Sequence, residues 1–375
     1  MKEIFSLLGL ALFAGTVIPS AQLKETSVRY KALAAISQGN LMVFPVSASA
    51  TFDTATFLTL DEGVRSGEVV VTETGQATGL VRPRVNLNDG VWREHPWPPI
   101  AEMPPLPQNG ARVNELSLTN NSNRPLLLLA GEIVTGGKQD RIVSKDRIIP
   151  AHSQPVALGV FCVEPHRWTQ TSAKFGAVDS SMAQPSIRSK AMAEKNQQEV
   201  WDEVAKSRSA FISTLGAPAA ARIQASSSYA VAMQNGAVQE KIDAVARPLE
   251  HSYDALIQKL RAENAVGAVV ALNGEIIWAD LFASPDLLNR YWPKLIRSYA
   301  AETFGWPHPP AFQHPLTVED AQTFLDRFGA THESIETEPD LYRQTEISGD
   351  DYSAFVLTSL LPGTRFNVHL AKMKH

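Results

Sequence analysis

The amino-acid sequence predicts an α+β fold: a β-sandwich-like N-terminal half packed with helices and a β-hairpin, plus a small α+β C-terminal extension. Three observations favour this class. Short apolar runs that alternate or are β-branched recur across residues 40–168, as in strands. Apolar residues at helical spacing follow in residues 186–262. An Asn-Gly turn between two apolar runs then indicates a hairpin, with a helix following, in residues 266–301.

The composition is that of a chain that builds a core. Of the 375 residues, 44% are hydrophobic and 19% are charged, with a formal net charge of −5. No long basic run is present, so we expect no nucleic-acid binding, which needs clustered Lys and Arg. The single cysteine, Cys162, excludes a disulfide within the chain, and its apolar neighbours indicate a small buried side chain.

The N-terminus has the pattern of a secretory signal. Lys2 precedes an apolar run at residues 4–18, which is too short to span a bilayer comfortably, and small residues follow. We expect residues 1–21 to be a signal peptide that is cleaved near residue 21, and the mature protein to be exported to the periplasm or beyond. The alternative is a buried N-terminal helix. No second apolar run is long enough to span a membrane, so no integral membrane protein is expected.

Strand-like runs fill the N-terminal half in order. They lie at residues 41–44, 69–71, 113–118, 126–129, 148–150 and 156–160. The polar turn at 120–125 predicts that residues 116–118 pair antiparallel with residues 126–129. Many short strands with polar turns indicate a sandwich. The stretch 82–107, rich in Pro and Trp, is interpreted as a long loop.

Two helical patterns follow the strands. Val200, Val204 and Phe211 mark the first, and a longer stripe extends over residues 238–260. Pro248 falls inside that stripe and is expected to kink or split the helix, because proline removes a backbone donor.

The clearest local signal is a hairpin followed by a capped helix. Residues 266–272 and 275–282 flank Asn273-Gly274, which accepts the positive φ angles of a two-residue turn. Ser284-Pro285 then predicts a helix start, with Leu288, Tyr291, Leu295 and Tyr299 on one side.

The sequence pattern changes near residue 303, which separates the last part of the chain from the main domain. A proline-rich stretch at 305–314 precedes Thr317, which can cap a helix that ends by Gly329, and strand-like runs follow at 354–360 and 366–370. The predicted organisation is thus a signal at 1–21, a main domain at 22–302 and an extension at 303–375.

Common catalytic motifs are absent from the sequence. Residues 131–139 resemble a phosphate loop only superficially, because Gly137 separates Gly136 from the lysine and Gln139 replaces the required hydroxyl residue. No zinc-protease motif or nucleophile-elbow serine appears, so no metal and no cofactor are expected.

Two polar clusters provide most of the candidate ligand-binding residues: residues 138–141 lie between two hydrophobic strands, and residues 164–168 follow the strand that holds Cys162. Guanidinium groups suit carboxylate or phosphate, tryptophan offers a stacking face, and two carboxylates could act as acid and base. The alternative is that the same groups form salt bridges between strands. The candidates are Glu132, Lys138, Gln139, Asp140, Arg141, Glu164, Arg167 and Trp168.

These residues also carry a family resemblance. Residues 128–132, 137–141, 149–151 and 162–168, together with 198–204 and 266–285, resemble the ARG and rhodanese-phosphatase-superfamily-associated protein domain over roughly residues 40–301. The resemblance implies no established activity, only an association with ADP-ribosyl-glycohydrolase-like and phosphatase-like proteins. Asp140 stands where that pattern usually has Asn, and a carboxylate there repels an anionic ligand.

Three functions remain open at this level. The first is a non-enzymatic binding or scaffolding domain in the cell envelope, with a small molecule or an envelope protein as partner. The second is a hydrolase of a sugar- or phosphate-bearing, ADP-ribose-like ligand, with Glu132 or Glu164 as acid or base. In the third, the polar set is structural and partners use the Pro/Trp loop at 92–107. Export favours the first, because ADP-ribose and nicotinamide dinucleotides are mainly intracellular.

Overall fold

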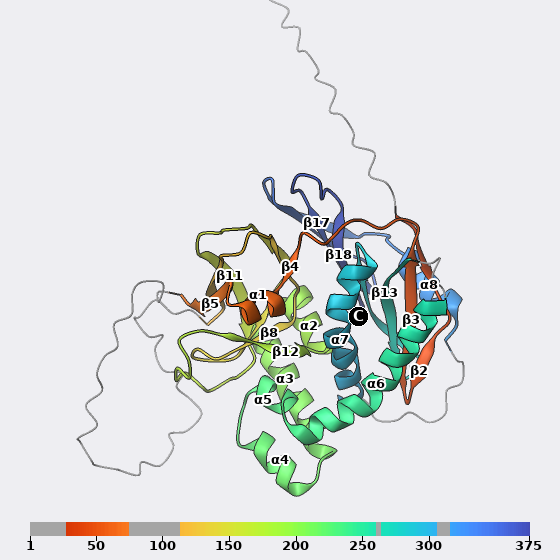
Figure 1. Ribbon diagram of the computed structural model, residues 1–375. Coiled ribbons are helices and arrows are strands. Elements are labelled where there is room, and N and C mark those ends of the chain that lie inside the picture. The colour runs from red at the N-terminus through yellow and green to blue at the C-terminus, as the bar shows by residue number, and fades with distance from the viewer. Residues whose placement is uncertain (1–27, 75–112, 260–263, 306–315) are drawn as a thin grey trace, which may run out of the picture.

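The computed structural model describes residues 28–74, 113–259, 264–305 and 316–375, and it places their strands in three sheets (Figure 1). Helices and strands are both abundant, so the α+β class is confirmed. The segments expected to be a signal peptide and a Pro/Trp loop lie outside the described residues.

The largest sheet combines strands from both ends of the chain. Its order is β1-β3-β13-β14-β18-β17-β16-β15, and β2 also pairs with β3, with every pair antiparallel. The strands are β1 (Tyr30–Ala32), β2 (Ile36–Gln38), β3 (Leu41–Ala48), β13 (Asn264–Leu272), β14 (Glu275–Phe282), β15 (His332–Glu338), β16 (Tyr342–Ser348), β17 (Tyr352–Ser359) and β18 (Asn367–Lys374). Residues beyond 303 therefore contribute four strands to a sheet begun at Tyr30.

The remaining strands form two smaller sheets, ordered β10-β7-β4 and β12-β8-β9-β11-β6-β5. They share one apolar core, in which Leu126 and Leu128 meet Leu116 and Leu118, so the arrangement is sandwich-like. The strands are β4 (Leu58–Thr59), β5 (Val69–Glu73), β6 (Glu115–Asn120), β7 (Leu126–Leu128), β8 (Glu132–Thr135), β9 (Arg141–Val143), β10 (Arg147–Ile149), β11 (Val156–Cys162) and β12 (Gly176–Met182).

The predicted pairing of residues 116–118 with 126–129 is wrong. β6 pairs with β5 and β11, whereas β7 pairs with β10 and β4 in the other sheet. The cause is Asn120, whose buried amide donates to the carbonyls of Arg124 and Pro150 at 2.8 and 3.0 Å. These bonds turn the polar segment into an arch between sheets instead of a hairpin.

The helices lie on several sides of the sheets (Figure 1). They are α1 (Leu60–Ser66), α2 (Pro185–Ser189), α3 (Gln197–Ser213), α4 (Ala217–Gln224), α5 (Tyr229–Met233), α6 (Gly236–Lys259), α7 (Pro285–Glu302) and α8 (Val318–Asp326). In this view α2, α6 and α7 lie between the sandwich and the large sheet, α3, α4 and α5 lie lower, α1 packs on the sandwich, and α8 packs on the other face of the large sheet. Pro248 was expected to kink or split its helix, and it does not split it, because α6 continues through Pro248 as one helix.

Local signals were accurate in the second half of the chain. Asn273 and Gly274 have φ angles of 53° and 79°, which confirms the tight turn between β13 and β14. Ser284 caps α7, accepting a hydrogen bond from the backbone of Leu287 at 3.0 Å, and Thr317 caps α8.

A fully buried ion cluster joins the sandwich to the large sheet. Arg188 of α2 binds both oxygens of Asp280 on β14, at 2.8 and 2.9 Å. His369 of β18 bridges Asp280, at 3.2 Å, and Asp146 of the β9–β10 loop, at 2.6 Å. Tyr299 of α7 donates to Asp280 at 2.5 Å. Burial lowers the pKa of His369, but the two carboxylates outweigh it and raise the pKa to about 9.

We predict that Asp280→Asn lowers the free energy of unfolding by about 3–5 kcal/mol, because it leaves the Arg188 charge buried without a counter-ion. Urea denaturation measures this change. Glu346→Gln removes the partner of the exposed Lys195 and is the control, with an expected loss of about 0–1 kcal/mol. Equal losses in both variants would contradict the prediction.

The cluster also predicts how stability depends on pH. The pKa of His369 is raised from 6.5 to about 9, so its contribution is complete below pH 6.5 and disappears as pH rises through 9. We expect the stability difference between wild type and His369→Gln to shrink by roughly 3 kcal/mol over that interval. Urea titrations at several pH values measure it, and a difference that does not vary with pH would show the expectation to be wrong.

Candidate functional site

An open depression of about 500 Å³ lies where the β8–β9 turn faces α5. The turn at 135–140 and the loop at 164–172 form its polar side, and α5 with the residue beyond it forms the other. Val231 stands on the α5 side and is 43% exposed, which gives the depression an apolar patch. Its lining residues are Thr135, Gly136, Asp140, Glu164, Arg167, Thr171, Ser172, Ala230, Val231 and Gln234.

Asp140 is the most constrained carboxylate in this depression. Its Oδ1 accepts from the backbone of Gly136 at 3.0 Å, and its Oδ2 accepts from the Ser228 hydroxyl at 2.6 Å. Ser228 also caps α5 by accepting from the backbone of Val231 at 3.0 Å. Burial raises the pKa of Asp140, and the Glu164 carboxylate beside it acts in the same direction. Both oxygens of Asp140 are thus committed to the fold.

Glu164 and Arg167 form the open part of the polar side. Arg167 Nη2 lies 2.5 Å from Glu164 Oε2 and 3.5 Å from Asp140 Oδ1, so one guanidinium serves both carboxylates. The same Oε2 accepts from the backbone of Asp140 at 3.0 Å. Within the described residues, Glu164 Oε1 receives no hydrogen bond, which leaves one carboxylate oxygen for a ligand.

Buried polar atoms without partners gather around the turn. In the described part of the chain, Glu73 Oε2, Gln139 Oε1, Arg141 Nε and Nη2, and Trp168 Nε1 have no hydrogen-bond partner. Glu73 belongs to this group because its other oxygen accepts from the backbone of Lys138 at 2.6 Å. Such orphaned groups are rare in proteins and are commonly satisfied by water or a bound molecule.

A glycine allows the turn to approach its neighbours. Gly137 has a φ angle of 51°, and a Cβ there would lie 2.2 Å from the Phe175 ring and 2.7 Å from Glu73. Beside it, the Lys138 ammonium lies 5.0 Å from the centre of the Trp168 ring. One face of the predicted stacking residue is therefore taken by the chain's own cation.

Only some of the eight candidate residues lie at the depression. Asp140, Glu164 and Arg167 line the depression, while Lys138, Gln139, Arg141 and Trp168 are not among its lining residues. Glu132 lies elsewhere, buried between strand and helix, where Lys294 of α7 binds it at 2.6 Å. Asp61 accepts from the same ammonium at 2.7 Å. Burial raises the pKa of Glu132 against the attraction of Lys294.

Sequence reasoning missed Ser228, Val231 and Glu73. Ser228 follows two other serines and precedes an apolar pentapeptide, which is a helix-cap signal that could have been noticed. Nothing in the sequence indicates that Glu73 or Val231 lies beside the turn at 135–140.

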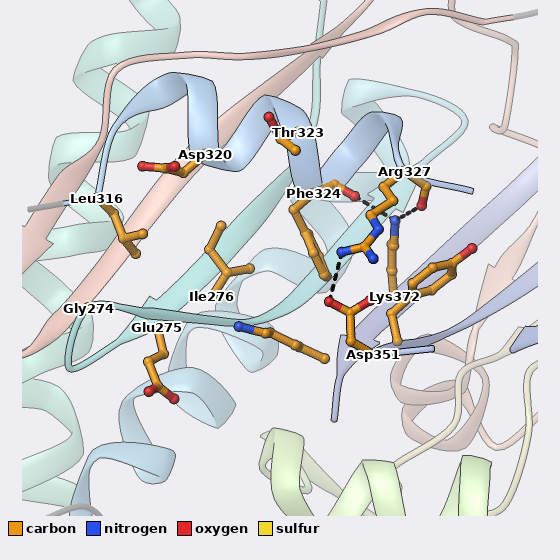
Figure 2. Close-up of a pocket in the computed structure, with 12 residues that line it drawn as sticks. Gly274, Glu275, Ile276, Leu316, Asp320, Thr323, Phe324, Arg327, Asp351 and Lys372 are labelled. Atoms are coloured by element: carbon orange, nitrogen blue, oxygen red, sulfur yellow. Dashed lines mark hydrogen bonds and ion pairs between the residues drawn. The ribbon is translucent and has the colours of Figure 1, made fainter. Parts of the chain in front are cut away.

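A second cavity, of about 250 Å³, lies between α8, the β13–β14 turn and the ends of β17 and β18 (Figure 2). Two of its cations, Lys372 and Arg327, are engaged with neighbouring groups of the chain. Lys372 donates to the carbonyls of Phe324 and Arg327 at the end of α8, and Arg327 binds Asp351 at 2.8 Å. The rings of Phe324, Phe328 and Tyr352 lie 4.7, 4.3 and 4.2 Å from the ammonium. These contacts hold α8 on the sheet.

Two further features are absent from the described residues. The described residues contain no group of three or more His, Cys, Asp or Glu arranged to hold a metal ion. Within the same residues, no helix combines the length and apolar character that crossing a bilayer requires.

The fold and the depression define an α+β protein with a sandwich-like half, a large antiparallel sheet and a polar surface site. The chain belongs to the family of the ARG and Rhodanese-Phosphatase-superfamily-associated Protein domain, whose model matches residues 29–371. The match extends past the resemblance at 40–301 and includes most of the residues beyond 303. No curated protein and no solved structure matches the chain significantly.

The position of Glu132 yields a stability prediction. Lys294→Met leaves the buried carboxylate of Glu132 and the half-buried carboxylate of Asp61 without this cation, so the free energy of unfolding should fall by about 3–5 kcal/mol. Lys206→Met, at an exposed position on α3, is the matched control, with an expected change within about 0.5 kcal/mol. Urea unfolding compares the two. A Lys294→Met protein as stable as the control would refute a structural role for this ammonium.

Proposed function

We propose that the protein is an exported binding domain whose depression takes a small, neutral, hydroxyl-rich ligand such as a sugar. The observation that carries the proposal is an open polar depression in which the lining residue Glu164 has no hydrogen bond to its Oε1 from the described residues. A sugar hydroxyl both donates and accepts, so it can donate to this oxygen and accept from a neighbouring donor of the lining. A volume of about 500 Å³ also lies within the range of small-molecule sites.

The charge around the depression supports a neutral ligand. The cations Lys138, Arg141 and Arg167 are balanced by the carboxylates Glu73, Asp140 and Glu164. A phosphate would have to displace Glu164 from Arg167 and would lie beside two carboxylates. Val231 offers an apolar surface for the carbon face of a sugar ring.

Hydrolysis is the second candidate, and the geometry favours it less. Glycosidases hold two carboxylates roughly 5–9.5 Å apart with the substrate between them. Here Asp140 and Glu164 share the Arg167 guanidinium, and both oxygens of Asp140 are hydrogen-bonded within the fold. Burial does raise the pKa of Asp140, which suits a general acid. The experiment below therefore includes hydrolysis as one of its outcomes.

Export rests on the sequence of residues 1–21, with its lysine, apolar run and small residues. N-terminal sequencing of secreted material tests it. A mature chain that begins near residue 22 supports export, and an intact N-terminus in the cytoplasmic fraction contradicts it.

We predict that a neutral mono- or disaccharide raises the melting temperature of the purified protein, because a ligand of the folded state stabilises it by mass action. Thermal-shift screening against neutral sugars, sugar phosphates and nucleotides identifies it, and calorimetry measures the affinity. Val231→Trp, which fills the depression from an exposed position, should weaken binding at least about tenfold.

Lys206→Trp, exposed on α3, is the matched control and should bind as wild type does. Binding confined to sugar phosphates or nucleotides would contradict the neutral-ligand proposal. Turnover of p-nitrophenyl glycosides that Val231→Trp abolishes would replace it with the hydrolase.

A further inference from the structure

One edge of the large sheet is open and exposed along its whole length. β15 pairs with β16 over seven residues without a register shift, and within the described residues no strand pairs with its outer side. Every residue of β15 is exposed, and Ile335 is 57% exposed. An edge of this kind presents unpaired backbone donors and acceptors, which is a template for another strand.

Three common protections of an edge strand, a proline, a lysine and a bulge, are missing from β15. Within His332–Glu338 there is no proline and no lysine, and its ladder with β16 contains no bulge. Its charges are Glu333, Glu336 and Glu338. Of these, Glu336 is already paired, because Lys145 lies 2.6 Å from both of its oxygens.

We propose that β15 pairs antiparallel with β15 of a second copy of this chain, about a two-fold axis at Ile335. The strand is self-complementary in that register. Ile335 faces its own copy, and Ser334 faces the neutralised Glu336. Glu333 faces Thr337 and His332 faces Glu338, so an acid lies opposite a hydroxyl or an imidazole.

The charge pattern selects this register over its neighbours. It is the antiparallel register that pairs all seven residues of the two strands, and in it no glutamate faces a glutamate. A shift by one residue in either direction places Glu333 opposite Glu336 or Glu338, and like charges directly opposite each other are destabilising. A basic peptide would satisfy the glutamates but would leave Ile335 and His332 without complementary partners.

The single buried cysteine makes a direct test feasible. Cys162 is fully buried, so a cysteine introduced on β15 is the accessible thiol in the described part of the protein. Ile335→Cys lies on the proposed axis and should form a disulfide-linked dimer under mild oxidation, seen on a non-reducing gel. Thr337→Cys faces Glu333 and should stay unlinked, while Glu333→Cys/Thr337→Cys should link again.

Sedimentation analysis of the full chain supplies the second arm. Wild type should have twice the monomer mass at high micromolar concentration, and Ile335→Lys should shift it to the monomer. The two proteins should have the same melting temperature at concentrations low enough for wild type to be monomeric as well. Glu240→Lys, exposed on α6, should leave the dimer intact. A monomer at every concentration, a dimer that Ile335→Lys does not dissociate, or equal cross-linking of Ile335→Cys and Thr337→Cys would each overturn the proposal, as would a monomer that binds basic peptides along β15.

Discussion

The bidentate contact between Arg188 and Asp280, extended through His369 to Asp146, is the interaction on which the arrangement of the two halves depends. Its members come from α2, β14, β18 and the β9–β10 loop. None of the four side chains is more than about 1% exposed, so each charge is satisfied by the others. Two carboxylates are balanced by one guanidinium and one imidazolium. The sandwich cannot move relative to the large sheet without exposing an unpaired buried charge.

The cluster also orients the strands that carry the candidate site. Asp146 accepts from the backbone of Ala130 at 2.8 Å, so it fixes the loop before β8 as well as the loop after β9. Gly131 has a φ angle of 90°, and a Cβ there would lie 2.5 Å from the Arg188 side chain. The position where the backbone passes Arg188 therefore requires a glycine. Lys294 fixes β8 from the other side through Glu132. The β8–β9 turn at residues 135–140 projects from this double attachment.

A structural feature could be predicted from the sequence where neighbouring residues cause it. Asn273-Gly274 and the caps at Ser284 and Thr317 are local backbone chemistry, and they were found. The β6–β7 pairing was wrong because Asn120 binds Pro150, a contact that no local pattern encodes.

The candidate site was found in part for the same reason. Asp140, Glu164 and Arg167 stood out as polar residues next to apolar strands, and the fold does bring them together. Val231 reaches the depression from α5, and Ser228, the N-cap of that helix, binds Asp140 across 88 positions of the sequence. Tertiary packing sets the role of both. Glu132 resembles its polar neighbours in sequence, but the cation that explains it, Lys294, lies 162 positions away.

Hydrogen–deuterium exchange in Asp146→Asn tests most directly whether the buried cluster holds the site in place. The substitution weakens the contact to His369 without touching the depression, and exchange reports local opening segment by segment. We expect faster exchange across residues 129–143, including the β8–β9 turn, with β16 and β17 unchanged. Unchanged exchange at 129–143, or a uniform increase throughout the protein, would contradict this account.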